Sequence, residues 1–354
     1  MLLKVAGRAT SPVYKPSIHI NQPMNTRFKL AATCYLAASL TAFADVKIND
    51  QLSFGGYVVG SYQLTDPNSG VSTDRFDLDA VKTVFMGSFK PVTGTVSLFY
   101  PGPAGNDVSV LDAYATYDAG GGVTITGGKF LSYLGYEAFD PVNMTQITYS
   151  PVTAGTLATI PAYHTGVRFD YGSKEWSVGA AIVDSVLGPT IFKGDAELQE
   201  NVGFEAFLKY TAVPNLTLWA GVAHDTDNNM SNPAAPFGHD VTIWNFWGEY
   251  KAGATTFAAE FATKDGGTGV RGDSWLLLVG QSFSDKFSTI FRVGGQSLSK
   301  STVRATGADD YMQYTVAPTW KISDNLSIRA EYSYYDMDAG GSKNFFGVQG
   351  LFKF

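Results

Sequence analysis

The feature that most constrains this chain is a repeated pattern of short segments in which apolar and polar residues alternate, each closed by turn residues. A period of two is typical of strands, because successive side chains point to opposite faces of a sheet. The pattern begins after residue 50 and continues to the end of the chain. We place sixteen strands at 52–64, 75–89, 95–101, 108–117, 123–130, 164–171, 176–184, 202–210, 216–224, 241–251, 255–263, 274–283, 287–297, 311–321, 326–336 and 344–354. An even number of strands is what a closed single-chain barrel requires.

The connections between these strands alternate between short and long. The short ones are 90–94, 118–122, 172–175, 211–215, 252–254, 284–286 and 323–325. The long ones are 65–74, 102–107, 131–163, 185–201, 225–240, 264–273, 298–310 and 337–343. Barrels of the outer membrane have tight turns on the periplasmic side and longer loops outside, whereas a soluble sandwich has no physical reason to sort its loops. The sequence therefore predicts an all-β fold, a transmembrane antiparallel up-and-down β-barrel of about sixteen strands.

Aromatic residues support the same fold. Ten of them adjoin the short connections, where a ring of amphipathic side chains would mark one membrane–water interface. They are Phe89, Tyr117, Tyr171, Trp176, Tyr210, Tyr250, Phe283, Phe287, Trp320 and Phe354. Within each strand the apolar row is expected to face lipid and the polar row to face the lumen. Charged residues make up 16% of the chain, below the level usual in soluble domains.

The N-terminus is expected to be an export signal. Residues 24–44 contain a short basic segment, an apolar stretch and an A-x-A cleavage site at Ala42-Phe43-Ala44, so Asp45 would begin the mature barrel, 45–354. Residues 1–23 precede this signal and are interpreted as a mis-assigned extension, with translation starting at Met24. The single cysteine, Cys34, falls within the signal. The 44 removed residues hold five basic groups and no acid, so the mature chain carries 20 basic and 32 acidic residues, a net charge of −12. That balance makes a nucleic-acid partner improbable.

One stretch resembles a known family. Residues 128–141 read Gly-Lys-Phe-Leu-Ser-Tyr-Leu-Gly-Tyr-Glu-Ala-Phe-Asp-Pro, and residues 164–171 read His-Thr-Gly-Val-Arg-Phe-Asp-Tyr. This arrangement is similar to the β-barrel porin-2 family, also called OmpL-like, and the similarity covers roughly residues 50–225. The resemblance implies an outer-membrane barrel of porin type, and it says little about the solute.

The longest connection, 131–163, is the third external loop, and in general porins that loop folds inward and narrows the channel. Glu137 and Asp140 are its acidic candidates for a constriction. Arg168, Arg292 and Arg329 are the basic candidates on the facing wall, with Lys82 and Lys129 as further possibilities. Acids on one wall and bases on the other would orient passing solutes and set charge preference. Alternatively, these charges only solvate the lumen or pair with neighbours. Further lumen candidates are Glu205, Lys209, Glu260 and Glu331.

No pattern in the sequence predicts catalysis, a metal site or a cofactor. Asp225-Thr-Asp227-Asn-Asn229 superficially resembles a calcium loop, but it lacks the required glycine and glutamate. We therefore expect a non-enzymatic porin in the outer membrane that lets small hydrophilic solutes diffuse, with a mild cation preference. A structural or adhesive barrel without an open channel is the alternative, followed by an outer-membrane hydrolase. Expected partners are membrane lipid and the barrel-assembly machinery, through the strand ending at Phe354. Trimerisation is left open.

Overall fold

The computed structural model describes residues 46–105, 107–137, 139–154, 157, 159–186, 201–227, 240–266, 270–301, 310–338 and 341–354. Seventeen strands form one sheet in these ranges. They are β1 Val46–Lys47, β2 Leu52–Pro67, β3 Thr73–Phe89, β4 Val92–Tyr100, β5 Ser109–Gly120, β6 Val123–Leu131, β7 Tyr163–Gly172, β8 Trp176–Val183, β9 Asn201–Tyr210, β10 Leu216–Asp227, β11 Val241–Ala252, β12 Thr255–Gly266, β13 Val270–Ser282, β14 Phe287–Ser301, β15 Tyr311–Lys321, β16 Leu326–Met337 and β17 Gly341–Lys353. Two short helical turns accompany them, η1 Gly102–Ala104 and α1 Pro151–Ala154.

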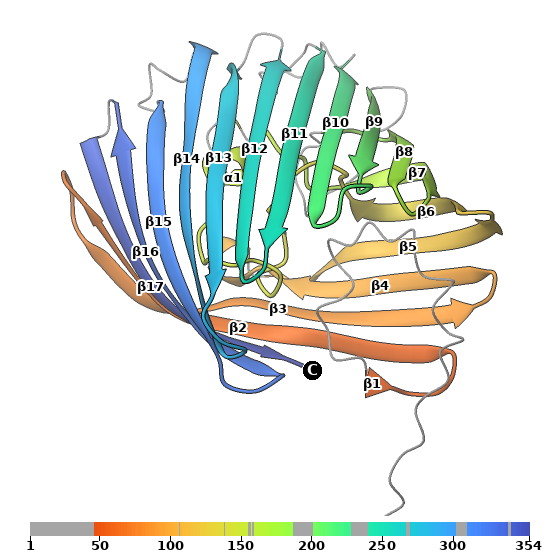
Figure 1. Ribbon diagram of the computed structural model, residues 1–354, viewed down its shortest axis with the longest axis horizontal. Coiled ribbons are helices and arrows are strands. Elements are labelled where there is room, and N and C mark those ends of the chain that lie inside the picture. The colour runs from red at the N-terminus through yellow and green to blue at the C-terminus, as the bar shows by residue number, and fades with distance from the viewer. Residues whose placement is uncertain are drawn as a thin grey trace, which may run out of the picture. The chain divides into compact units, whose positions relative to one another are not determined.

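The sixteen strands β2–β17 close into an antiparallel barrel. Each pairs with its neighbours in chain order, and β17 pairs with β2, from Lys343 opposite Pro67 to Lys353 opposite Tyr57. Figure 1 shows β2 in orange beside β17 in blue. Closure leaves no free sheet edge, so every backbone polar group of the wall can be paired within it. The two-residue strand β1 is an addition that pairs only with the start of β2.

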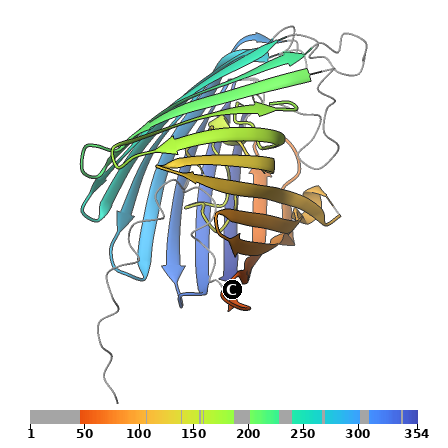
Figure 2. The same ribbon diagram turned by 90° about the vertical axis from the view of Figure 1, so that its right-hand side faces the viewer.

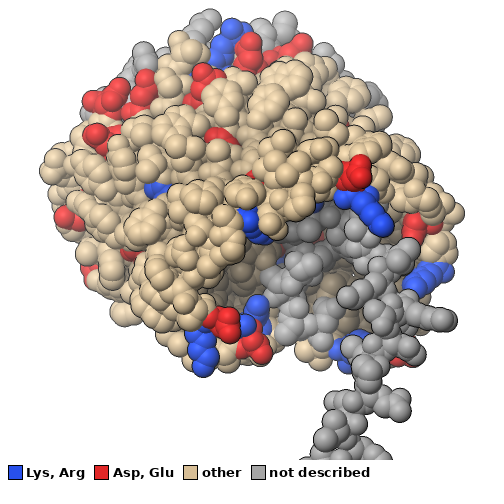
Figure 3. Space-filling view, in the orientation of Figure 1, with Lys and Arg blue, Asp and Glu red and all other residues tan. Residues whose placement is uncertain are grey.

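The period of two sorts the side chains of the wall into two faces. On β16, Ile328 and Tyr332 are 40% and 46% exposed, whereas Arg329 and Glu331 between them are 4% and 1% exposed. The outer face is apolar in the other strands too, and the inner face carries the buried polar and charged side chains together with apolar ones such as Leu276 and Leu278 of β13. Figure 3 shows broad uncharged areas on the visible face. This confirms the predicted assignment of faces.

Aromatic side chains ring the end of the barrel at which the strands are joined by short turns, here called the short-turn end. Phe89, Tyr117, Trp176, Tyr210 and Tyr250 are all between 40% and 53% exposed. Neighbouring rings touch: Phe287 lies 5.0 Å from Trp320 and 5.4 Å from Phe283, measured between ring centroids. The opposite end, where the longer connections leave the strands, is the long-loop end. The predicted aromatic ring is confirmed.

All sixteen predicted strands are present, and most are longer than predicted. The largest errors are of four residues: β13 begins at Val270 and not at residue 274, and β14 ends at Ser301 and not at residue 297. β4 begins at Val92 and not at residue 95, because the predicted turn 90–94 shrinks to Lys90-Pro91. The short elements β1, η1 and α1 were not predicted. None of the described helices is long and apolar enough to cross a membrane. The predicted extension 1–23 and signal 24–44, with Cys34, lie outside the described residues, as do parts of seven of the eight long connections.

Candidate functional site in the barrel lumen

The connection between β6 and β7 folds into the barrel, and we call residues 132–162 the inward loop. Its polar groups bond to inward-facing side chains of ten wall strands, β2, β3, β7, β9, β11, β12, β13, β14, β15 and β16. Figure 2 shows this yellow-green segment within the ring of strands. The helical turn α1 is part of it, and Val152 of α1 packs with Leu276 and Leu278 of β13. The interior therefore consists of a polar wall and a loop bound to it.

Three wall carboxylates accept hydrogen bonds from the inward loop. Glu205 of β9 accepts from the Ser132 hydroxyl at 2.6 Å and from the Tyr133 N–H at 3.0 Å. Glu260 of β12 accepts from the Tyr136 N–H at 2.8 Å. These acids are 2% and 3% exposed. Because a loop leaves its backbone N–H groups unpaired, such carboxylates satisfy donors that would otherwise be buried without partners.

Glu331 of β16 does the same further along the loop. It accepts from the Thr148 N–H at 3.0 Å and also from the Ile147 N–H and the Thr148 hydroxyl. On its own strand, the Ser333 hydroxyl donates to it at 2.7 Å. Glu331 is 1% exposed. The three predicted lumen acids Glu205, Glu260 and Glu331 thus face inward and hold the loop.

The loop acid Glu137 forms an ion pair with Arg292 of β14. Its carboxylate also accepts from the Gln146 side chain at 2.7 Å and the Ser150 N–H at 2.8 Å. Arg292 donates in addition to the Thr148 carbonyl at 2.9 Å. The side chains of Glu137 and Arg292 are 3% and 0% exposed. This pair joins the middle of the loop to the wall.

The second loop acid, Asp140, binds another part of the wall, formed by β2 and β3. Its carboxylate lies 3.0 Å from the Lys82 ammonium of β3 and accepts from the Tyr57 hydroxyl of β2 at 2.9 Å. Lys82 also pairs with Asp112 of β5 at 2.9 Å. Lys82 was a secondary candidate in the sequence, and the structure makes it the direct partner of Asp140.

The remaining basic candidates have different surroundings. Arg329 of β16 donates to the loop carbonyls of Met144 and Gln146, the latter at 2.9 Å, and does not pair with a loop acid. Arg168 of β7 lies 3.5 Å from Asp170, and its guanidinium sits over the Phe130 ring at 4.8 Å. The last basic candidate is Lys209 of β9. Within the described residues, neither arginine pairs with Glu137 or Asp140.

An aromatic stack lines the lumen beneath the start of the loop, and sequence reasoning missed it. Phe207 of β9 and Trp219 of β10 stack at 4.4 Å with planes 3° apart, and Trp219 stacks on Trp247 of β11 at 5.3 Å and 8°. Loop rings close both ends: Tyr133 lies 4.6 Å from Phe207, and Tyr136 lies 5.5 Å from Trp247. The available signal was that all three wall rings occupy inward positions of their strands, where polar residues were expected.

Lys209 of β9 also faces the lumen, as predicted, and stands opposite Trp219 in the strand register. It is partly exposed, unlike the acids discussed above. Its position is closer to the short-turn end than that of Glu205. Lys209 therefore belongs to the part of the lumen that solvent reaches.

Two tyrosines of the inward loop keep their protons. Burial raises the pKa of the Tyr136 phenol, and the nearby Glu249 carboxylate, which accepts its hydrogen bond at 3.0 Å, raises the pKa further. Burial and Asp170 likewise raise the pKa of Tyr133, whose hydroxyl donates to Asp170 at 2.8 Å. Both phenols therefore remain donors that hold the loop.

The acidic and basic side chains of the candidate constriction contact each other, whereas the sequence led us to expect acids and bases on separate walls. Glu137–Arg292 and Asp140–Lys82 are buried contacts, as in the alternative that the charges pair with neighbours. Such pairs hold a fixed geometry, and their mutual neutralisation weakens the transverse field they could produce. That these residues set ion selectivity stays a prediction.

Within the described ranges, no group of three or more His, Cys, Asp or Glu side chains is arranged to hold a metal ion. Asp225 and Asp227 of the calcium-like segment lie in β10, and residues 228 and 229 fall outside the described residues. His164 of β7 is buried, with its Nε2 3.4 Å from Glu205.

The chain is similar to known proteins in sequence and in fold. Residues 52–353 match the family model described as "Putative beta-barrel porin-2, OmpL-like". Comparison with the curated proteins finds no match. The fold is similar to that of several solved outer-membrane proteins, at identities that bear on the fold alone.

Three of these structures illustrate the similarity. OmpF of Salmonella typhi, in complex with daunomycin, has a TM-score of 0.65 at 14% identity, over 88% of this chain and 100% of that one. An anion-selective porin from Comamonas acidovorans has a TM-score of 0.63 at 10% identity, over 86% and 99%. OmpT of Vibrio cholerae, an outer membrane protein in a trimer form, has a TM-score of 0.59 at 15% identity, over 86% and 99%. All three are covered almost completely.

Proposed function

The chain belongs to the β-barrel porin-2, OmpL-like family, and from this premise we propose that it lets small hydrophilic solutes diffuse passively across the outer membrane. The chain is an outer-membrane barrel of porin type, and the proposal concerns what passes through it. The observation that carries the proposal is the closed wall of sixteen strands with a polar interior. A barrel of this strand number is wide enough to hold an aqueous passage, whereas an eight-strand barrel is filled by its own side chains.

In this proposal no chemical step occurs. The lumen replaces part of the hydration shell of a solute and excludes larger solutes by size. The inward loop sets that size, because Glu205, Glu260 and Glu331 hold it against the wall. A loop bound by charged hydrogen bonds on several sides is a fixed restriction, and a fixed restriction gives a defined exclusion limit.

The hydrolase alternative has one suggestive cluster, formed by Ser132, Glu205 and His164. A serine nucleophile needs a histidine that accepts its proton and an acid that orients the histidine. Here the Ser132 hydroxyl donates to Glu205 at 2.6 Å, and His164 lies on the same carboxylate at 3.4 Å. The acid therefore stands between serine and histidine, which is the wrong order for activating the serine. We propose that the cluster is structural and the protein is not an enzyme.

The closed-barrel alternative is favoured by the extent to which the inward loop occupies the lumen. Leu157, Thr159 and Val152 are fully buried between the loop and the wall. If the loop seals the lumen, the barrel would serve as a structural or adhesive element. The two functions differ in one measurable property, which is conductance.

The test is a recording from the purified mature chain in a planar lipid bilayer. The pore predicts stepwise conductance increases, and liposomes containing the protein should swell in small sugars at a rate that falls as the sugar becomes larger. Protein unfolded before addition is the control for detergent artefacts. Repeated insertion without conductance, shown by protease protection of the barrel in the same membranes, would establish a closed barrel instead.

Export and assembly complete the proposal. We propose that residues 24–44 direct export and are removed, and that the C-terminal strand ending at Phe354 is read by the barrel-assembly machinery. A trimer is the proposed oligomer, and one structurally similar protein is described in a trimer form. Cross-linking of the purified protein in mild detergent distinguishes a trimer from a monomer.

A further inference from the structure

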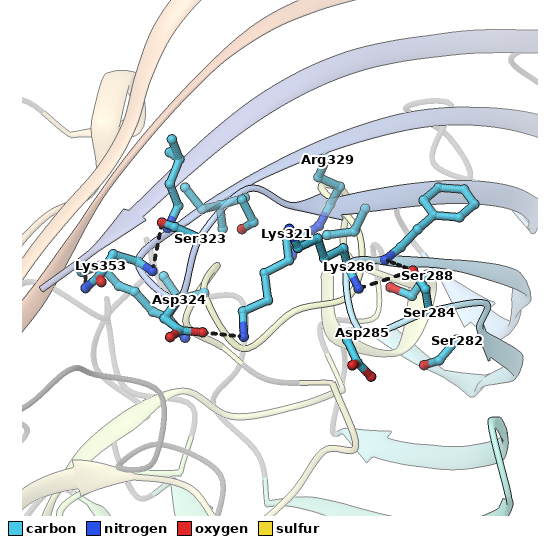
Figure 4. A pocket seen from close by; sticks show the side chains of 17 residues that line it. Ser282, Ser284, Asp285, Lys286, Ser288, Lys321, Ser323, Asp324, Arg329 and Lys353 are labelled. Carbon is cyan, nitrogen blue, oxygen red and sulfur yellow. Dashed lines mark hydrogen bonds and ion pairs between the residues drawn. The ribbon is translucent and has the colours of Figure 1, made fainter.

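A cavity of about 300 Å³ opens at the short-turn end of the lumen, beneath the strands β13–β17. Figure 4 shows the side chains that line it, and Val142 of the inward loop forms part of the lining. A volume of this size is at the lower end of the range for small-molecule sites, roughly 300–1,000 Å³. The cavity is thus large enough for one small solute and lies on the route that solutes of the proposed porin would take.

The strand register brings hydroxyl groups together in this cavity. Ser282 of β13 is opposite Ser288 of β14, and Thr319 of β15 is opposite both Ser288 and Arg329 of β16. These residues form one row across four neighbouring strands, all on the inward face. The hydroxyls of Ser288 and Thr319 form no hydrogen bond with any residue that the structure describes. They are therefore available to a polar solute.

Basic groups surround this row. Lys321 of β15, Lys353 of β17 and Lys286 of the β13–β14 turn line the rim, and Arg329 lines the buried part of the cavity. In Figure 4, Lys353 and Lys286 lie on either side of Lys321. Within the described ranges neither Lys286 nor Lys353 takes part in an ion pair. Arg329 is 4% exposed, and its Nε has no hydrogen-bond partner in the described structure.

The acids of the cavity neutralise only part of this charge. Asp324 pairs with Lys321 at 2.8 Å, and its side chain is 92% exposed. Asp285 is the only other acid in the lining. Four cations and two carboxylates leave an excess of positive charge, although the mature chain as a whole is strongly acidic. A cavity with low-dielectric walls and an excess of one charge concentrates ions of the opposite sign.

We propose that this cavity is a binding subsite for a small phosphorylated polyol, such as a sugar phosphate, on its way through the barrel. The lysines and Arg329 suit a phosphate, which takes several charged donors at once, and the row of hydroxyls suits the hydroxyl groups of the polyol. The proposal rests on the proposed porin function and adds a solute class to it. It predicts that this end of the lumen favours anions, in contrast to the mild cation preference expected from the net charge of the chain.

The first test measures binding without requiring conduction. Glucose 6-phosphate and glucose are titrated into the refolded mature chain in detergent, followed by calorimetry. Glucose 6-phosphate should bind and glucose should bind at least tenfold more weakly. The double variant K321Q/K353Q should weaken glucose 6-phosphate binding at least tenfold. Equal binding of the two sugars, or unchanged binding by the double variant, would overturn the subsite.

Matched controls lie at the same end of the barrel. K90Q and K174Q each remove one exposed lysine from a short turn outside the cavity, and should leave binding unchanged. D324N should strengthen binding about threefold, because it frees Lys321 from its ion pair. Loss of binding in K90Q equal to that in K321Q/K353Q would show a general charge effect and refute the site.

The second test measures the site in a bilayer. Glucose 6-phosphate added on the short-turn side should interrupt the current at lower concentration than on the other side, and K321Q/K353Q should abolish the difference. The mature chain has no cysteine, so V71C, with a side chain at an 83%-exposed position near the long-loop end, reports orientation through an impermeant thiol reagent. Absence of any current refutes the porin function and leaves the calorimetric result to decide the subsite. Symmetric block with current present refutes the subsite alone.

Discussion

Lys82 of β3 and Asp140 of the inward loop lie 3.0 Å apart, and the side chain of each is 2% exposed. Their pairing joins the loop to β3, which lies three strands from Glu331 of β16 and five from Arg292 of β14 around the wall. A charge buried to this degree is stable only with its partner, because removing one partner leaves the other without water or counter-charge. The loop is therefore held from two sides by interactions that cannot be lost separately at low cost.

Breaking this pair should be more costly from the lysine side. K82M leaves Asp140 and Asp112 buried without a cation, and should lower the free energy of unfolding by about 3–5 kcal/mol. D140N should cost less, about 1.5–3 kcal/mol, because Lys82 keeps Asp112 at 2.9 Å. Urea unfolding in micelles, followed by tryptophan fluorescence, measures both. K90M, at an exposed turn, is the control and should change stability by less than about 0.5 kcal/mol. The opposite order of costs would mean that Asp140 holds the loop mainly through partners other than Lys82, such as the Tyr57 hydroxyl.

Loosening the inward loop at Glu331 should have a larger effect on the channel current than on the stability of the barrel. E331Q removes the negative charge that accepts from the N–H groups of Ile147 and Thr148, which share one carboxylate oxygen. It also replaces the second oxygen, which accepts from the hydroxyls of Thr148 and Ser333, by an NH₂ donor. A loss of about 1–3 kcal/mol at this anchor should raise the population of displaced loop by roughly tenfold or more. Single-channel recordings should show more frequent current fluctuations and a larger mean conductance. E175Q, at an exposed turn, should behave as the unmodified protein; equal fluctuations in both variants would exclude Glu331 as an anchor.

The lipid-facing surface can be tested at Leu277 of β13, which is 55% exposed on the outer face. L277R places a guanidinium in the hydrocarbon region and should destabilise the barrel in lipid vesicles by about 2–4 kcal/mol. V71R, at an exposed position between β2 and β3, should have almost no effect. Reversible unfolding from vesicles measures the difference. Equal stability of L277R and V71R would show that β13 does not face lipid.

Phe354 allows recognition by the barrel-assembly machinery to be tested separately from closure of the barrel. Its N–H donates to the Gly56 carbonyl at 3.0 Å, and its carbonyl accepts from the Gly56 N–H at 2.8 Å. F354A keeps both backbone bonds and removes only the ring, so it should refold in detergent as well as the unmodified chain and yet insert poorly in cells. Heat-modifiable migration on gels reports folding in both settings. Normal insertion of F354A in cells would contradict recognition through the ring.

The sequence predicted the wall far better than the contents of the lumen. Strand periodicity is a local property, so positions such as Ile328 and Arg329 could be assigned to opposite faces directly. The partners of Glu137 and Asp140 could not be assigned, because several basic residues face the lumen and the path of the loop decides which of them each acid meets. The stack of Trp219 and Trp247 was missed for a related reason: two apolar rings at inward positions make sense only once the loop covers them.

The position of the inward loop along the chain has a consequence for assembly. It is made before β7–β17, yet its partners on β9, β12, β14 and β16 lie 73 to 185 residues further on. Glu137 and Asp140 are buried in the finished barrel. While the early strands insert, there is no complete barrel interior for these two acids to occupy. Contacts so distant along the sequence form late, since the intervening chain must first be ordered. The nascent barrel is thus expected to pass through a stage with its interior vacant, and to acquire its restriction only as the last strands meet the first.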